Sequence, residues 1–244
     1  MVMKQSALLR FIEKYTLGGE IKSVKWTSDG NSLSTRFISG DKSLVGSVKL
    51  SNFTDIDPST VGVYNTGQFV SLMKILGEDV DVDFTQMGDK FVSAEMKDSN
   101  GTKSKYMLSD LSVIPTPPDL KNLPSEWDLE LDIDSQFINT FIGGKSALPD
   151  TDTFTIAVNG EKVEVIIGFS NVATNRVTIP VTGKKTGDID VVSFNATMFA
   201  NILTANKECQ KAVLKVSSQG IATISFNIDD YYSEYYLVAT QQVN

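Results

Sequence analysis

The sequence predicts an α+β fold built from two similar units in tandem. Residues 64–108 resemble residues 194–238, at an offset of 130 that drifts to 132. Tyr64-Asn65 matches Phe194-Asn195, and Gly88 matches Gly220. Each half also reads as helix, strands, helix, strands, which is an α+β order. A repeat period near half the chain indicates two tandem domains and not a solenoid of short units.

The first unit is expected to begin with a helix that Ser6 caps and Gly18-Gly19 ends. A second helix is expected at 66–76, with Phe69, Leu72 and Met73 in its buried stripe. Apolar residues recur at helical spacing in the first helix: Leu8, Leu9, Ile12 and Tyr15. Alternating apolar residues predict six strands: 21–27, 33–38, 44–51, 80–85, 91–97 and 103–109.

The second unit repeats this order. Ser135 is the expected cap of a helix that Gly143-Gly144 ends, and a second helix is expected at 197–206. The turns at Gly30 and Gly160 fall at matching positions. The expected strands are 154–158, 162–169, 176–181, 189–194, 212–217, 221–229 and 234–240. Helices of about ten residues are marginal alone, so each must pack on a sheet.

A proline-rich stretch divides the two units. Residues 116–124 hold three prolines, which favour an extended chain with few ladder hydrogen bonds. The sequence therefore predicts an N-terminal domain at 1–115, a connector at 116–127 and a C-terminal domain at 128–244. Trp127, directly after the prolines, is expected to anchor the domains.

Composition excludes much of enzyme chemistry. The chain has no His and a single Cys, Cys209. A zinc site or a Ser–His or Cys–His nucleophile system therefore cannot be assembled. Alternating acids at Asp79, Asp81 and Asp83 are expected to form a solvated strand face, not a metal site. The same applies to the acids at 128, 130, 132 and 134. We expect no enzyme activity, no cofactor and no metal.

Charge and hydropathy set further limits. The net charge is −8, with 13 Lys and Arg against 14 Asp and Glu in residues 1–118 and 9 against 16 in the rest. A protein that encircles DNA needs positive charge only on its inward face. No apolar run approaches the roughly 20 residues of a membrane span. With no secretory signal near Met1 and no disulfide framework, a cytoplasmic location is expected, in the host cell if a phage encodes the chain.

The end of the chain resembles the final hairpin of DNA sliding clamps, the processivity factors of replication. This hairpin runs through Gln219-Gly220, Asp229-Asp230 and Tyr235-Tyr236. The helix before it, with its Phe-x-x-Ile-Leu core, is similar to the clamp helix in that place. Two domains of this length match the trimeric clamps, and the short chain looks most like a T4-type phage clamp.

The resemblance implies a clamp fold and a topological function. Three chains of two domains would close a ring around duplex DNA and keep a DNA polymerase on its template. The implied partners are two further copies of the chain, double-stranded DNA bound non-specifically, the C-terminal peptide of a polymerase, and an ATP-dependent clamp loader. Whether the chain also serves as a transcription co-activator, as some phage clamps do, stays open.

The same resemblance implies which residues line the ring. Basic residues on or beside the four helices would face DNA: Lys4, Arg10, Lys14, Lys74, Lys145, Lys207 and Lys211. Each can equally be an ordinary solubilising residue. The third helix carries Asn139 and Thr140 where a basic residue would help, so the lining of the second domain looks thin.

A partner groove and a subunit joint are also implied. The groove would be lined by Phe37, Ile38, Leu120, Leu123, Tyr236, Val238 and Ala239, although core packing is an alternative for most of them. Tyr235 and Tyr236 point to opposite faces of a strand, so only one can line it. The joint would pair a strand near 103–108 with one near 176–181 of the next chain.

Two other classes of protein remain as alternatives. The first is a phage structural protein built of duplicated β-rich domains, which an acidic, His-free surface would also suit. The second is a glycosidase with paired carboxylates, which would need a concave pocket that neither acidic strand predicts.

Overall fold

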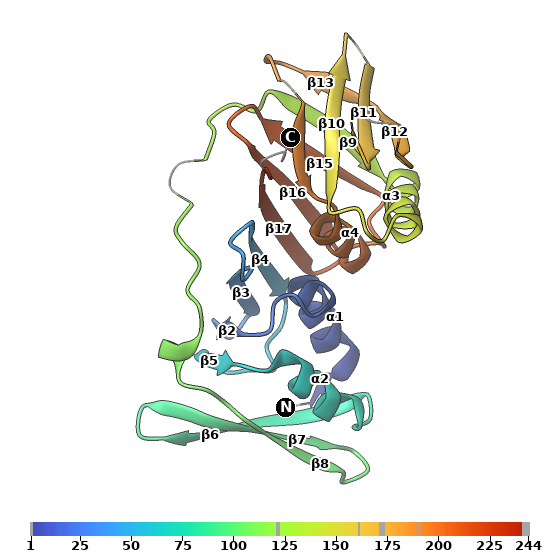
Figure 1. Ribbon diagram of the computed structural model, residues 1–244. Coiled ribbons are helices and arrows are strands. Elements are labelled where there is room, and N and C mark those ends of the chain that lie inside the picture. Colours follow the sequence, from blue (N-terminus) through green and yellow to red (C-terminus); the bar gives the residue numbers. More distant parts are fainter. Residues whose placement is uncertain (1, 121–122, 161, 171–173, 190, 241–244) are drawn as a thin grey trace. The chain divides into compact units, whose positions relative to one another are not determined.

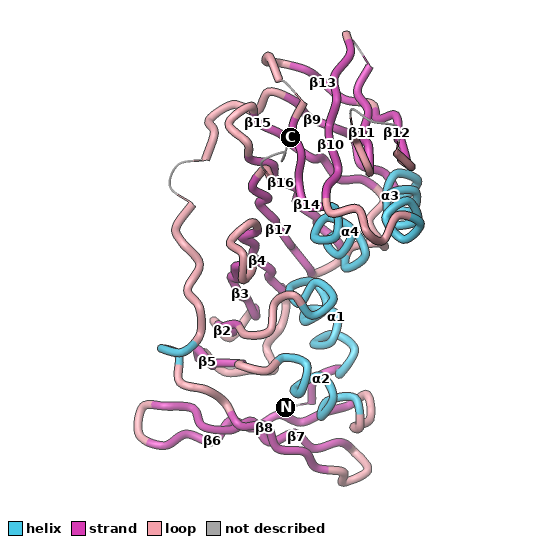
Figure 2. The backbone as a smooth tube through the Cα atoms, viewed as in Figure 1, coloured by secondary structure: helices cyan, strands magenta, loops and turns pink. Residues whose placement is uncertain are grey.

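The computed structural model describes residues 2–120, 123–160, 162–170, 174–189 and 191–240. Two compact units divide the chain. Unit 1 holds Met1–Ile38, Gly46–Pro117 and Asp229–Ser233, and unit 2 holds Ser39–Val45, Pro118–Ile228 and Glu234–Asn244. Figures 1 and 2 show the helices and strands of each unit.

Unit 1 contains two short helices and two groups of antiparallel strands. The helices are α1 (Gln5–Thr16) and α2 (Thr66–Lys74), which pack on each other, with 3₁₀ turns at Leu17–Gly19 and Leu111–Val113. One group is ordered β1-β6-β7-β8 and the other contains β3-β2-β5. Their bounds are β1 Val2–Lys4, β2 Val24–Ser28, β3 Ser32–Ile38, β5 Ser59–Val63, β6 Asp79–Met87, β7 Lys90–Asp98 and β8 Lys103–Met107.

Unit 2 has the same composition of elements. Its helices α3 (Ser135–Ala147) and α4 (Ala196–Ala205) lie side by side. One sheet is ordered β12-β11-β10-β14, and a second group is ordered β13-β9-β15-β16. The bounds are β9 Leu129–Asp134, β10 Thr153–Asn159, β11 Lys162–Ile167, β12 Val177–Val181, β13 Gly183–Lys185, β14 Val192–Asn195, β15 Lys211–Ser217 and β16 Ile221–Ile228. Strands β4 (Leu44–Ser51) and β17 (Tyr231–Val238) contribute residues to both units.

Aromatic side chains hold the helices of unit 1 on its strands. The Phe69 ring of α2 lies 5.0 Å from Trp26 and 5.2 Å from Tyr106, both edge to face. The indole N–H of Trp26 donates to the Tyr15 hydroxyl at 3.2 Å. Burial raises the pKa of Tyr15, so this hydroxyl stays protonated and can itself donate. Edge-to-face pairs add roughly 0.5–1.5 kcal/mol each beyond the apolar area they bury.

In unit 2, a cluster of phenylalanine rings packs the helices on the strands in the same way. Phe141 of α3 lies 4.9 Å from Phe199 of α4, and Phe154 of β10 lies 4.8 Å from Phe199. All three rings are fully buried. Gly144 lets α3 approach the sheet closely, because an added Cβ would meet Ile167 and Val177 at 3.1 Å.

The internal repeat is confirmed at its most specific position. Asn65 caps α2 by accepting the N–H of Gln68 at 3.0 Å, and Asn195 caps α4 by accepting that of Met198 at 2.8 Å. The matched glycines also share a backbone conformation. Gly30 and Gly160 have φ of 84° and 63°, and Gly88 and Gly220 have 64° and 79°. The offsets of 130 and, further along, 132 therefore align residues with equivalent local structure.

Several helix ends differ from the sequence-based expectation. Ser6 lies inside α1, and its hydroxyl donates to the Glu78 carboxylate instead of capping the helix. The cap of α3 is Asp134, which accepts the Phe137 N–H at 2.7 Å, and Ser135 is the first helical residue. Gly143-Gly144 does not end α3, which continues to Ala147. The missing side chain of Gly144 is used for packing against Ile167 and Val177, whereas Gly143 is exposed. Helix α2 ends at Lys74, two residues early.

Most expected strands are present with shifted ends, and β4 matches its expected range. Strands β1, β5 and β13 were not expected. They are three to five residues long and carry too few alternating apolar residues to stand out. The expected strand near 189–194 is only Val192–Asn195, and residue 190 lies outside the described part of the chain.

Asp98 organises the turn between β7 and β8. Its carboxylate accepts the N–H of Gly77 at 3.0 Å, and those of Thr102 and Asn100 at 2.8 and 3.0 Å. These bonds hold its pKa below the usual range, the Gly77 bond contributing most.

We expect Asp98→Asn to lower stability at neutral pH. Because the folded pKa is depressed, the carboxylate stabilises the fold above the unfolded pKa of about 3.9, and this contribution is lost as pH falls through the folded value. The difference in urea midpoint between wild type and variant should therefore shrink between pH 7 and pH 3. An equal difference at both pH values would contradict this assignment.

Candidate nucleic-acid interface and partner groove

The four helices carry almost no acidic residues. They hold one of the chain's 30 Asp and Glu, Glu13, and four of its 22 Lys and Arg: Arg10, Lys14, Lys74 and Lys145. Helix α4 has no charged residue at all. In a chain of net charge −8, the helices therefore carry a single negative charge, that of Glu13.

The exposed helix positions are mostly small and polar. They are Ser6 and Glu13 on α1, Gly67, Gln68, Ser71 and Lys74 on α2, Ser135, Gln136, Asn139, Thr140, Gly143, Ser146 and Ala147 on α3, and Thr197 and Thr204 on α4. Four of the hydroxyls donate back to the carbonyl four residues earlier at 2.8–2.9 Å: Ser71, Thr140, Ser146 and Thr204. Such a face can meet a polyanion without repelling it, yet offers few strong contacts.

The basic residues on α1 and directly before it are engaged within unit 1. Lys4 forms an exposed ion pair with Asp79, whose hydrogen bond and charge raise the pKa of the Lys4 ammonium. The Arg10 guanidinium lies 2.8 Å from the Asp229 carboxylate and 4.7 Å above the Tyr231 ring. Lys14 was expected to face DNA, but its side chain is buried, with its ammonium 5.6 Å from the Tyr231 ring. We therefore remove Lys14 from the candidate DNA-facing set.

The other four basic candidates are more accessible. Lys74, Lys207 and Lys211 are exposed. The Lys145 ammonium donates to the carbonyls of Pro149 at 2.7 Å and Leu148 at 3.5 Å, so it satisfies acceptors beyond the end of α3. Lys211 lies on β15, beyond the helix that it was expected to end.

The groove candidates divide into core and surface residues. Phe37 was expected to line the groove, but it is 2% exposed and packs 6.3 Å from the Tyr15 ring, so core packing explains it. Ile38, Leu120 and Leu123 are half-buried. Tyr235 is fully buried and Tyr236 half-buried, which agrees with their opposite faces.

The chain's last described residues are fixed within unit 2 by backbone bonds. Val238 donates to the Ser43 carbonyl at 2.8 Å, and Ala239 donates to that of Gly220 at 2.8 Å. Val238 is 47% exposed, and Ala239 is half-buried. A partially exposed apolar surface is thus present at this end of β17.

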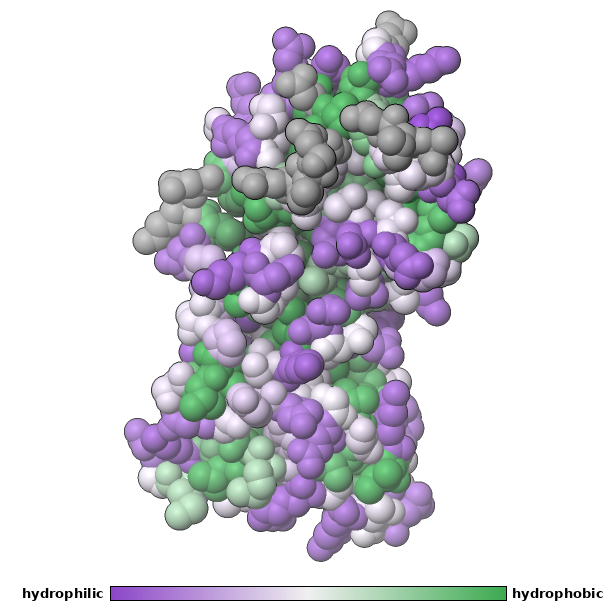
Figure 3. Space-filling view, viewed as in Figure 1, coloured by the Kyte–Doolittle hydropathy of each residue, from purple (hydrophilic) through white to green (hydrophobic). Residues whose placement is uncertain are grey.

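Figure 3 shows a further apolar group of side chains near the end of the β6–β7 hairpin, where Met87 and Val113 are exposed.

Among the strands that end a sheet in the described structure are β8 and β12. Strand β8 is the last of β1-β6-β7-β8, and β12 is the last of β12-β11-β10-β14. They contain the segments that were expected to meet at the subunit joint, one in each unit. Open edges expose unpaired N–H and C=O groups and favour pairing with another chain.

The acidic residues of β6 lie mostly on an exposed face of the strand. Asp81 and Asp83 are exposed on β6, as expected for a solvated face, and no group of three potential metal ligands occurs among the described residues. Within the same residues, no helix has the length and hydropathy required to cross a membrane.

Comparison with known proteins identifies the fold. No protein-family model matches the sequence, and neither does any curated protein. The structure is similar to the crystal structure of Proliferating Cellular Nuclear Antigen from Entamoeba histolytica, with a TM-score of 0.73 over 98% of this chain and 97% of that chain. Sequence identity is 13%, so the similarity is one of fold. The chain has the α+β fold of a two-domain sliding clamp.

The sequence identified the basic candidates, but the scarcity of acidic residues in the same helices was not noticed there. The scarcity of acids in the four helices is visible once helix bounds are known, and it involves 44 residues instead of seven. A search for positive charge overlooks it, because most of these positions are uncharged.

Arg10→Ala should lower the free energy of unfolding by about 1 kcal/mol, since it removes a partly exposed ion pair and a cation–π contact. Lys74→Ala, on the exposed face of α2, should leave it unchanged. Chemical denaturation of both variants measures the difference. Equal stability would show that Arg10 is not held by Asp229 and Tyr231 in solution.

Proposed function

We propose that this chain is a sliding clamp, in which three copies form a ring that encircles duplex DNA and tethers a replicative polymerase. The protein would perform no chemistry of its own. Domains at 1–115 and 128–244, joined by the connector 116–127, would supply six similar units to the ring.

The observation that carries this proposal is the distribution of charge within a clamp fold. Duplex DNA carries one negative charge per about 1.7 Å of axis, so a lining must exclude acids more strictly than it must collect bases. One acid in four helices, against 29 elsewhere, meets that requirement. A small number of cationic contacts also favours sliding, because each contact with a phosphate must be broken before the ring can move along the DNA.

The two open edges support assembly into a ring. Strands β8 and β12 belong to different units, so pairing between them joins unlike surfaces of two copies. Head-to-tail contacts of this kind generate closed rings when the rotation per copy closes. We propose that β8 of one chain pairs with β12 of the next.

We further propose the partners that a clamp requires. The surface that includes Ile38, Leu120, Leu123, Tyr236, Val238 and Ala239 would receive the C-terminal peptide of a polymerase, and an ATP-dependent loader would open the ring. We keep as a proposal, from the resemblance of the sequence alone, that this chain is a T4-type phage clamp acting in the host cytoplasm. Service as a transcription co-activator would use the same surface.

Topological binding gives the decisive test. Chains dissociated by dilution would be concentrated in the presence of nicked circular plasmid, and the mixture separated by gel filtration before and after linearisation. Encirclement predicts co-elution with the circle and loss on linearisation. Binding that survives linearisation, or no binding to the circle by a protein that forms trimers, would reject the proposal.

A carboxylate introduced on a helix face should shorten residence on circular DNA. Thr140→Glu on α3 would add three negative charges to the lining of a trimer, and we expect a several-fold shorter half-life at low salt. The effect should diminish at higher salt, because the screening length falls from about 30 Å at 0.01 M to about 10 Å at 0.1 M. Ser125→Glu, outside the helices, is the matched control. Equal half-lives for both variants would remove α3 from the lining.

Met107→Pro should weaken the ring and spare the chain's own fold. Leu108 donates its N–H to Val92 at 3.0 Å, so the alternate residue Met107 directs its N–H to the open edge. Proline removes that donor, whereas Met107→Thr keeps it. Sedimentation equilibrium should show weaker self-association for the proline variant alone, with unchanged circular dichroism. Identical sedimentation of both variants would refute this joint.

A further inference from the structure

Residues on and beside the open edges of β8 and β12 carry opposite charges, and these charges affect the register in which two copies of the chain would pair. This inference rests on the proposed ring, and it concerns which residues meet when β8 of one copy pairs with β12 of another. The edges can be compared group by group, since each strand's pairing within its own sheet is known.

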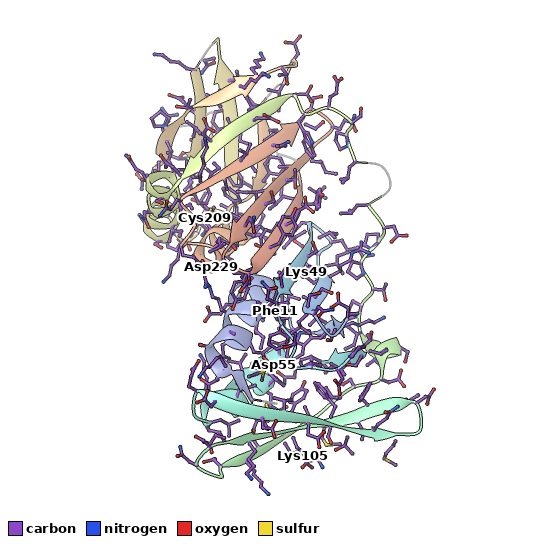
Figure 4. The ribbon with its side chains drawn as sticks, turned by 180° about the vertical axis from the view of Figure 1, so that it is seen from behind. Phe11, Lys49, Asp55, Lys105, Cys209 and Asp229 are labelled. Carbon is purple, nitrogen blue, oxygen red and sulfur yellow. The ribbon has the colours of Figure 1, made fainter. Side chains whose placement is uncertain are left out.

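On β8 the groups that face the open edge belong to Lys103, Lys105 and Met107. The intervening Ser104 and Tyr106 turn their backbone groups toward β7, in step with the Leu108-to-Val92 bond. The side chains of all three edge-facing residues are exposed, while those of Ser104 and Tyr106 are buried. Figure 4 labels Lys105 on this sheet.

On β12 the edge-facing residues are Thr178 and Pro180. A proline has no N–H to donate, so within a sheet it occupies a position whose nitrogen faces the edge. Both side chains are exposed, whereas that of Ile179 is buried. The next residue in this series, Thr182, already uses its carbonyl to accept the Asp132 N–H at 2.9 Å.

These two edges match in the orientation of their faces. On each strand, the residues that bond outward are those whose side chains face solvent. An antiparallel joint therefore places both core faces on the same side of the combined sheet. A register with Lys103 opposite Pro180 and Lys105 opposite Thr178 uses both free positions of β12 and leaves Thr182 with its existing partner.

In this register, Lys103 of one copy and Glu164 of the next copy lie on either side of Pro180. Lys103 lies opposite Lys97 on β7, a like-charge pair. Asp81 of β6 lies opposite Lys97 on its other side, and the charge of Lys103 helps to lower the pKa of Glu95. Lys105 already pairs with Glu95 at 2.9 Å, but neither Lys97 nor Lys103 has an ion-pair partner among the described residues. On the other edge, Glu164 lies opposite Pro180 on β11 and is likewise without one.

We propose that Lys103 of one copy pairs with Glu164 of the neighbouring copy across Pro180. Strands lie about 4.8 Å apart, so residues two strands apart are separated by about 10 Å at the backbone. A lysine and a glutamate side chain together span that distance, and the short proline ring between them leaves the path open. The neighbouring carboxylate would offset the repulsion between Lys97 and Lys103 and favour this register over a slipped one.

Charge reversal in the full-length protein tests the pairing. Sedimentation equilibrium over a concentration series would compare wild type, Lys103→Glu, Glu164→Lys and the double variant. An exposed pair of this kind should change the joint's dissociation constant by about two- to fivefold. Each single variant should assemble more weakly, and the double variant should return close to wild type. High salt should reduce these differences.

A control variant and two contrary outcomes distinguish the proposed ring from the proposed Lys103–Glu164 pair. Lys22→Glu, an exposed change of equal charge outside both edges, should assemble as the wild type does. A wild type that stays monomeric at all concentrations would overturn the ring itself. Trimers in which the single effects simply add in the double variant would overturn the Lys103–Glu164 pair and leave the ring standing.

Discussion

The packing of short helices on antiparallel sheets is the constraint on which the rest of the structure depends. Helices of 9 to 13 residues have little stability alone, so each must bury one face completely. Phe69 performs this for α2 against Trp26 and Tyr106, and Phe199 performs it for α4 against Phe141 and Phe154. With one face fixed by aromatic packing, the opposite face of each helix becomes free for another purpose.

The proposed position of the helices around DNA would explain why they differ so much in charge from the chain around them. A strongly acidic protein gains solubility from its surface charge, and the strands and loops of this chain carry nearly all of it. Negative charge on the helices would oppose the passage of a polyanion through a ring. Small hydroxyl and amide side chains avoid that repulsion, and their bonds to the helix backbone reduce the groups available for tight binding.

The sequence alone was sufficient where a pattern is local and repeated. Asn65 and Asn195 cap equivalent helices, and the turns at Gly30 and Gly160 match, because cap and turn chemistry depends on neighbouring residues. Sequence-based predictions were wrong where tertiary packing determines the position of a side chain. Lys14 is buried beside Tyr231, which lies 217 residues later, and Gly144 continues a helix because the sheet approaches it. The edge positions of β8 and β12 were expected from the family resemblance and not from a local pattern, because they follow from sheet order.

The central claim is that three copies of this chain close into a ring around a hole that fits duplex DNA. Two-dimensional class averages of the purified protein in the electron microscope test it most directly, at a concentration where the chains associate. A closed ring of three chains predicts particles with three-fold symmetry, six similar lobes and a central opening wider than the DNA double helix. Compact monomers, two-fold dimers or open filaments would contradict it.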